Sequence, residues 1–103
     1  MRNHKIRNAG EFYVLAQLAQ REFIADKTDD GQTLVDVIAT DSNTLKAINI
    51  QVKTTEDERA QWIISQKNET HFASLLYVLV QLNGSIQMPN FFIYHSNEIG
   101  SWL

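Results

Sequence analysis

The stretch LLYVLVQL at residues 75–82 constrains the fold of this chain more than any other segment. Residues 75–80 are all apolar, but a run of that length is far shorter than the roughly 20 residues that a membrane-spanning helix needs. A short, nearly continuous apolar segment is typical of a β-strand that is covered on both faces. The sequence therefore predicts a sheet with packed structure on either side of this strand.

Length, charge and the lack of cysteine set the class of protein. The chain has 103 residues, which predicts one domain spanning 1–103. No cysteine is present, which excludes disulfides, thiolate-bound zinc and a thiol nucleophile. The net charge of −3 excludes a generally basic nucleic-acid coat but leaves room for a local basic face. The basic start lacks the apolar region of a secretion signal, so we expect a cytoplasmic protein.

Periodicity predicts an α/β (α+β) domain, with a mixed central β-sheet flanked by helices. Residues 9–22 are expected to form a helix with an apolar arc, and Asn8 with Glu11 has the spacing of a capping box. The apolar arc contains Phe12, Leu15, Leu18, Ala19 and Phe23. Strands are expected at 23–27, 34–40, 45–55, 61–65, 75–82 and 91–95, with a short helix at 68–73.

Asp36 is the unusual residue of the second expected strand, because it interrupts the apolar run LVDVIAT at 34–40. A carboxylate in a half-buried strand is costly unless it has a partner. A hairpin of 34–40 with 45–54 brings Gln51 and Lys53 near Asp36, since both project from one face of the alternating segment. Oxygen ligands suit Mg²⁺, and a neighbouring ammonium group stabilises negative charge that develops on a phosphate.

Glu11 adds a further carboxylate, because it falls inside the apolar arc of the first helix and so faces the body of the protein. Each of these residues also has a purely structural interpretation. Glu11 could serve only the capping box, and Asp36 could form an ion pair with Lys53. Gln51 and Lys53 could belong to the solvated face of an amphipathic strand.

The order of helix Glu11, strand Asp36, hairpin and Gln51-Val52-Lys53 resembles the PD-(D/E)XK nuclease superfamily. The resemblance implies a minimal restriction-endonuclease-like core. In it, Glu11 matches the first-helix acid, Asp36 the metal-binding aspartate and Lys53 the motif lysine. Gln51 stands where the family usually has a glutamate or aspartate, as in its QxK variants, and Val35 replaces the motif's nominal proline.

That resemblance implies a nuclease that hydrolyses phosphodiester bonds in nucleic acid, with DNA as the expected partner and Mg²⁺ or Mn²⁺ as the cofactor. Asp36, Gln51 and Glu11 would hold the metal, and Lys53 would assist catalysis. The alternative is a catalytically inactive module that keeps the nuclease fold and acts in nucleic-acid binding or protein assembly, because a fold does not entail an activity.

The remaining candidates are weaker. His4, His71 and His95 lack the spacing of metal ligands, and Trp62 is expected in the core. A local phosphate-contacting face could contain Lys5, Arg7, Lys53, Arg59 and Lys67. The last residues are rich in large apolar side chains, which predicts a homodimer unless they fold back onto their own sheet. These side chains are Phe91, Phe92, Ile99, Trp102 and Leu103.

Overall fold

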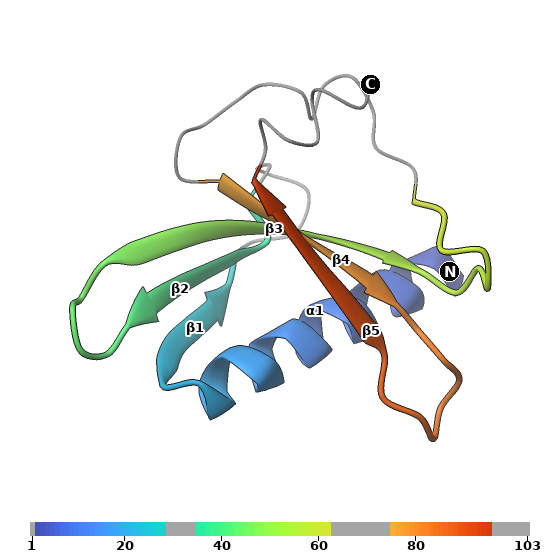
Figure 1. The fold of residues 1–103 in the computed structure, drawn as a ribbon, viewed down its shortest axis with the longest axis horizontal. Helices are drawn as coiled ribbons and strands as arrows, with labels where there is room; N and C mark the ends of the chain where they lie inside the picture. Colours follow the sequence, from blue (N-terminus) through green and yellow to red (C-terminus); the bar gives the residue numbers. More distant parts are fainter. Residues whose placement is uncertain (1, 29–34, 63–74, 96–103) are drawn as a thin grey trace.

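A computed structural model describes residues 2–28, 35–62 and 75–95 of the chain. In these residues one helix, α1 (Arg2–Gln20), precedes a five-stranded sheet in the order β1-β2-β3-β4-β5 (Figure 1). The strands are β1 (Phe23–Lys27), β2 (Val37–Asp41), β3 (Ala47–Thr55), β4 (Leu75–Gln81) and β5 (Asn90–His95). Neighbouring strands are antiparallel except β3 and β4, which are parallel. The prediction of an α+β fold with a mixed sheet is confirmed.

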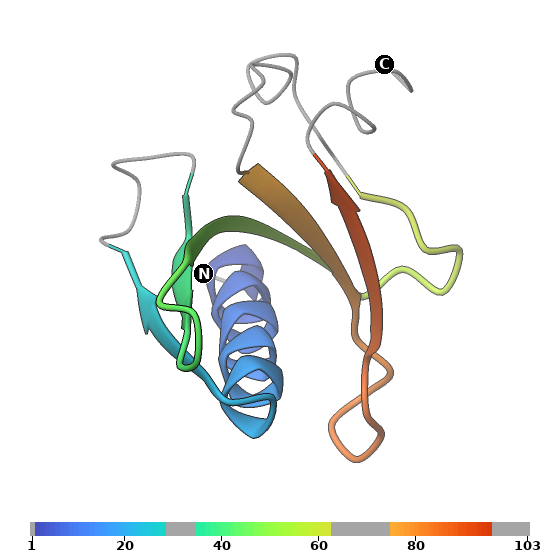
Figure 2. The same cartoon turned by 60° about the vertical axis from the view of Figure 1, so that its left-hand side comes forward.

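Helix α1 lies against one face of the twisted sheet, with β1 and β2 on one side of it and β4 and β5 on the other (Figure 2). The core on this face is made of small and branched apolar side chains from α1, β2, β3 and β4: Val14, Val37, Ala39, Ile50, Val52, Val78 and Val80, with Phe91 of β5 at its border. The opposite face has a second cluster of Leu75, Tyr77 and Leu79, with Val35, Trp62 and Tyr94 packed on it. Strand β4 is therefore buried on both faces, as its sequence predicts.

The helix differs from the sequence prediction at its start and on its apolar arc. It begins at Arg2 rather than near residue 9, so Asn8 lies inside the helix and the capping box with Glu11 is wrong. Its buried stripe contains Val14, while Phe12 is 58% exposed and lies under the Lys27 ammonium, 4.7 Å from the ring centre. The prediction erred because a glycine and a glutamate occupy the buried stripe, which makes the helix only weakly amphipathic.

Gly10 sets how closely α1 approaches β3. A Cβ atom placed on Gly10 would lie 1.8 Å from the Thr54 hydroxyl oxygen and 2.8 Å from the Thr54 Cβ. No residue other than glycine fits such a contact unless the helix or Thr54 moves. The following residue, Glu11, is thereby held close to the sheet.

The predicted strands agree with the structure apart from their ends. The segment 23–27 and the 34–40/45–55 hairpin are confirmed, although β2 begins at Val37 and β3 at Ala47. The hairpin turn is organised by Asp41, whose Oδ1 accepts the backbone N–H groups of Asn43 (2.8 Å) and Thr44 (3.2 Å). Strands β4 and β5 match their predictions to within one residue.

Two predicted elements fall partly or wholly beyond the described chain. Residues 61 and 62 do not form the start of the strand expected at 61–65, and 63–65 lie outside the described residues. The helix expected at 68–73 also lies outside them. Within the described chain, no helix combines the length and the apolar character needed to cross a bilayer.

Candidate functional site

Asp36 lies at the point where β2 and β3 separate. The last paired residues of the hairpin on this side are Val37 and Ile50, and the Asp36 N–H still donates to the Ile50 carbonyl at 2.8 Å. The next β3 N–H is bonded by a side chain instead of a main-chain carbonyl: Asp36 Oδ2 accepts the Val52 N–H at 2.8 Å. The carboxylate thus lies beside β3 rather than pointing outward from a regular strand.

The surroundings of Asp36 disfavour its charge. Burial raises the pKa of the Asp36 carboxyl from 3.8 to about 6, against the opposing effect of the hydrogen bond from Val52. The negative charge of Glu11 raises this pKa further, while the positive charges of Lys53 and Arg7 lower it. Groups from α1 and β3 therefore act on one carboxylate, and raised carboxyl pKa values of this kind are common in functional sites.

Lys53 shows the complementary effect. Burial lowers the pKa of its ammonium group, the Asp36 carboxylate opposes that shift, and Arg7 adds to it. The Asp36 hydrogen bond goes to the β3 backbone, so the two groups influence each other without the direct ion pair considered from the sequence. A half-buried lysine with a lowered pKa costs stability, which is a recurrent property of residues kept for function.

Glu11 reaches the same region from the middle of α1. Its side chain is only 3% exposed, and the Lys27 ammonium on β1 lies 3.2 Å from its Oε1. Its negative charge raises the pKa of the Asp36 carboxyl, so the two carboxylates influence each other electrostatically. The structure therefore brings Glu11 into the site, but with a basic partner that the sequence did not reveal.

Gln51 lies on the face of β3 away from α1, where it is paired in register with Tyr77 of β4. The side chain is 7% exposed, so it does not belong to a solvated strand face. Its Oε1 atom is buried without a hydrogen-bond partner among the described residues. Buried side-chain oxygens are rarely left in that state, and one that is requires an explanation such as an ion or a ligand.

The field of Asp36 extends to this second face. Burial raises the pKa of the Tyr77 hydroxyl, and the Asp36 charge raises it further. Asp36 thus influences groups on both faces of the sheet, because it occupies the gap between β2 and β3.

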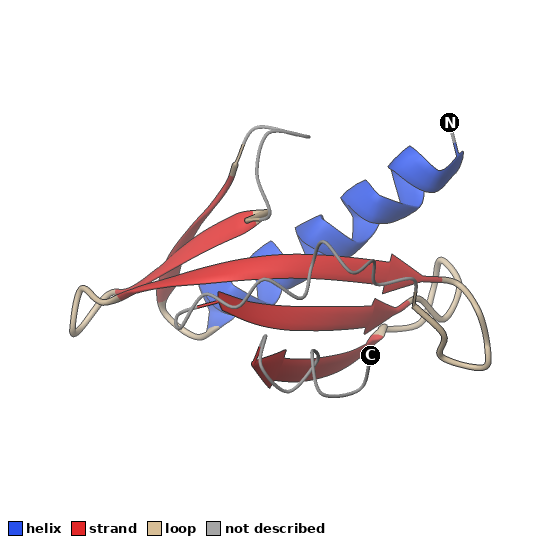
Figure 3. Ribbon diagram, turned by 90° about the horizontal axis from the view of Figure 1, so that it is seen from above, coloured by secondary structure: helices blue, strands red, loops and turns tan. Residues whose placement is uncertain are grey.

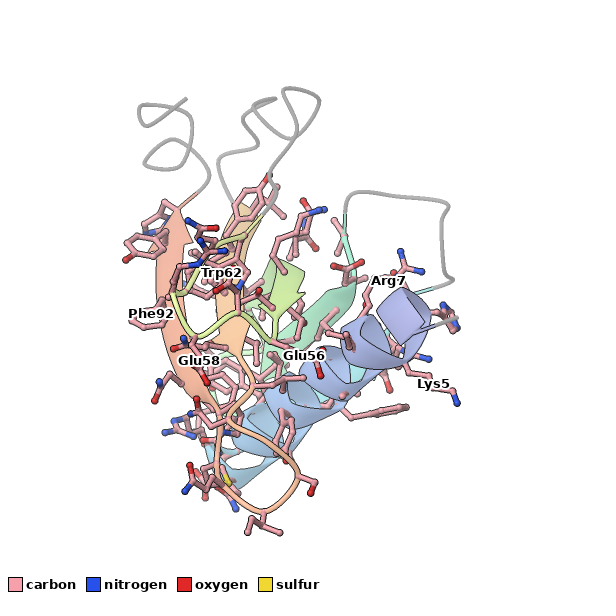
Figure 4. The ribbon with its side chains drawn as sticks, turned by 90° about the vertical axis from the view of Figure 1, so that its right-hand side faces the viewer. Lys5, Arg7, Glu56, Glu58, Trp62 and Phe92 are labelled. Carbon is pink, nitrogen blue, oxygen red and sulfur yellow. The ribbon has the colours of Figure 1, made fainter. Side chains whose placement is uncertain are left out.

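Arg7, which the sequence offers only as one of several cations of a phosphate-contacting face, acts on this site. It lies four residues before Glu11, hence one helical turn away on the same side of α1. Arg7 and Lys5 project from the first turns of α1 (Figure 4). The Arg7 guanidinium contacts His4 Nδ1 at 3.1 Å, and its charge acts on both Asp36 and Lys53. Its spacing from Glu11 was the signal that could have identified it.

Other sequence candidates lie elsewhere. Arg59 is exposed and pairs with Asp57 at 3.1 Å. Trp62 belongs to the cluster on the sheet face away from α1, as expected of a core residue. Its Nε1 donates to the Val80 carbonyl at 3.1 Å. Nowhere in 2–28, 35–62 and 75–95 do three His, Asp or Glu side chains gather to bind a metal. His71 and Lys67 lie outside these ranges.

The comparison with known families and proteins adds no relative. No protein-family model matches the chain, and no curated protein matches it either.

Proposed function

We propose that this domain is a divalent-metal-dependent nuclease that hydrolyses phosphodiester bonds in nucleic acid, with DNA as the expected substrate, in the cytoplasm. The observation that carries the proposal is that the charges of Glu11, on α1, and Lys53, on β3, both act on the half-buried Asp36 carboxyl where β2 and β3 separate. Burial disfavours the charged forms of both Asp36 and Lys53, and apolar side chains at these positions would pack without that cost.

The donor atoms at this point fit a hard cation such as Mg²⁺ or Mn²⁺. Such ions take carboxylate and amide oxygens and retain several waters. Asp36 keeps one carboxylate oxygen beyond the Val52 bond, Gln51 has an unpartnered Oε1, and Glu11 has a second oxygen beyond its Lys27 contact. When bound, the metal would polarise the phosphate and activate a water molecule.

Two cationic side chains of the protein, Lys53 and Arg7, would act on the substrate phosphates. The Lys53 ammonium would stabilise negative charge that develops on the phosphate in the transition state. Its half-buried position reduces competition from solvent around that charge. Arg7, an exposed cation whose charge acts on both Asp36 and Lys53, would hold a neighbouring phosphate of the substrate.

A second candidate function is a nuclease-fold module that binds nucleic acid or assembles with protein without catalysis. Two features favour it. Glu11 already has a basic partner in Lys27, and position 51 holds a neutral amide. Both reduce the negative charge available to a cation.

Two isosteric variants, Asp36→Asn and Lys53→Met, test the proposal. Asp36→Asn keeps an oxygen that can accept from Val52, and Lys53→Met keeps the apolar stem. Asp26→Asn and Lys46→Met make the same chemical changes at exposed positions and serve as matched controls. Calorimetry with Mn²⁺ reports binding, and cleavage is followed on single-stranded, duplex and branched substrates.

We expect Mn²⁺ binding to disappear in Asp36→Asn and cleavage to fall by about 100-fold or more in Lys53→Met, with both controls unchanged. Unaltered Mn²⁺ binding in folded Asp36→Asn would contradict the assignment of the metal site to Asp36. Cleavage that survives both EDTA and Lys53→Met would place the activity elsewhere. Absence of cleavage on every substrate would favour the binding module, which predicts binding that weakens steeply with salt if nucleic acid is its partner.

A further inference from the structure

We propose that Lys27 is an internal cation that competes with the divalent metal for Glu11 and so keeps the metal affinity of the site low. The inference rests on the proposed function, because Glu11 is a metal ligand only in that proposal. It adds a means of regulating the site, since the strength of metal binding then depends on where one ammonium group lies.

Lys27 reaches Glu11 from the last residue of β1. Helix α1 lies along one face of the sheet (Figure 3), and Lys27 shares a strand face with Phe23 and Ala25, which pack on the core that contains α1. The ammonium group lies 3.2 Å from Glu11 Oε1 and 4.7 Å from the centre of the Phe12 ring. Two successive residues of α1 therefore hold the same cation.

The end of β1 that places this cation is also bonded to Asp36. Lys27 is paired in register with Val37, the residue after Asp36. The Thr28 N–H donates to the Asp36 carbonyl at 2.9 Å. The Lys27 ammonium thus partners a carboxylate, Glu11, whose own charge acts on the Asp36 carboxyl, and it does so from the strand next to Asp36.

Burial makes the ammonium an effective competitor. The Glu11 side chain is 3% exposed and that of Lys27 is 23% exposed, so water screens their attraction only partly. A buried carboxylate requires a positive partner, and a metal ion or an ammonium group can each meet that need. Both cations on one carboxylate would repel each other, so a metal at the second oxygen of Glu11 is disfavoured while Lys27 holds the first.

The charge balance points the same way. In the described part of the chain, three cations act on the two carboxylates proposed as ligands, Glu11 and Asp36. These cations are Lys27, Lys53 and Arg7. Hard divalent ions bind best where negative charge is in excess, so removing one of the three cations should strengthen the site.

Calorimetry with Mn²⁺ tests the inference on the native chain and on Lys27→Met, which removes the charge and keeps the apolar stem. We expect the Mn²⁺ affinity to rise about tenfold or more in Lys27→Met. Lys27→Arg keeps the charge and should bind Mn²⁺ as the native chain does. Adding Glu11→Gln to Lys27→Met should abolish the gain. Lys46→Met, at an exposed lysine, is the matched control and should show no gain.

Denaturation with and without Mn²⁺ gives a second measurement that does not involve cleavage. A bound ion stabilises the folded chain, so Mn²⁺ should stabilise Lys27→Met more than it stabilises the native chain, because the ion takes the place of the missing ammonium group. Lys27→Gln, which removes the charge but keeps a hydrogen-bond donor, should behave in the same way and serves if Lys27→Met does not fold.

Mn²⁺ binding that is no tighter in the folded Lys27 variants without charge than in the native chain overturns the inference. An equal gain in Lys46→Met, or a gain that survives Glu11→Gln, also overturns it, since Glu11 would not be the group released. These outcomes are distinct from those of the proposed function, which depend on Mn²⁺ binding by Asp36→Asn and on cleavage by the native chain.

Discussion

The molecule has a charged half, formed by α1, β1, β2 and β3, and an uncharged half, formed by β4, β5 and the Trp62 side chain packed on them. Around α1, β2 and β3, ionised side chains penetrate the fold: Glu11 is buried, and Asp36 and Lys53 hold shifted pKa values. Strands β4 and β5 contain no charged residue and are held by apolar packing and neutral hydrogen bonds.

This difference separates two requirements of the molecule. The uncharged half supplies burial, which stabilises the fold at any ordinary pH. The charged half places groups where burial disfavours them, and such conflict between local stability and residue choice is expected at functional sites. Changes in the charged half should therefore respond to pH and to the removal of a partner, while changes in the uncharged half should not.

The largest expected effect comes from removing the partner of Glu11. Lys27→Met leaves a carboxylate that is 3% exposed without its ammonium partner at 3.2 Å. Breaking one side of a buried ion pair should lower the free energy of unfolding by about 3 kcal/mol. Chemical denaturation measures the loss. Lys46→Met, at an exposed lysine, is the control.

A second substitution tests whether the loss comes from the unpaired charge. Adding Glu11→Gln to Lys27→Met removes that charge and should restore most of the stability. A double variant no more stable than Lys27→Met would show that Lys27 acts through its packing on Phe12 instead.

The contact between α1 and β3 gives the next effect. Gly10→Ala places a Cβ atom 1.8 Å from the Thr54 hydroxyl oxygen. The forced shift should cost about 2 kcal/mol, net of the gain in helix propensity. Thr54→Ala removes the closest clash and a hydroxyl without a partner, so it should be nearly neutral alone and should reduce the cost of Gly10→Ala. Equal costs in both backgrounds, measured by denaturation, would contradict this account.

Asp36→Asn should increase stability, with a gain that depends on pH. The Asp36 pKa rises from 3.8 to about 6 on folding, so the unfolded chain ionises first as pH increases. The native chain therefore loses stability between about pH 4 and 6, relative to the variant, and the loss is complete above pH 6. Allowing for solvent screening of a partly exposed group, the gain should be about 1–2 kcal/mol above pH 6 and close to zero below pH 4.

Denaturation at a series of pH values measures this profile. Glu11, Lys53 and Arg7 all act on the Asp36 carboxyl, so its own contribution is the difference from Asp36→Asn at each pH. The exposed control Asp26→Asn should show little such gain. A gain of equal size at pH 3 and pH 8 would show that the effect comes from packing rather than ionisation.

Much of the fold could be predicted from the sequence because the relevant signals are local. The uninterrupted apolar residues of β4 indicated a strand covered on both faces, and the alternation in β3 placed Gln51 and Lys53 on one side. Asp36 was conspicuous because a carboxylate in an apolar run requires an explanation.

The rest depended on contacts that local patterns do not encode. The start of α1 was missed because its first residues are polar, and Phe12 was misplaced because Lys27, from another element, covers its ring. The Val52 N–H as the partner of Asp36 follows from where β2 ends beside β3, not from residue types. Arg7 was expected only as one cation of a phosphate-contacting face, and its effect on Asp36 depends on α1 starting early enough to include it.

The smallest expected loss of stability comes from a substitution in the uncharged half, Trp62→Phe. Trp62→Phe keeps an aromatic ring against Phe92 but removes the Nε1 donor to the Val80 carbonyl at 3.1 Å. The loss should be about 1 kcal/mol, the usual net value of a neutral hydrogen bond. No ionisable group takes part in that bond, so the loss should be the same at pH 5 and pH 8, in contrast to Asp36→Asn. A loss that changed by more than half between those pH values would contradict the statement that stability in the uncharged half does not depend on pH.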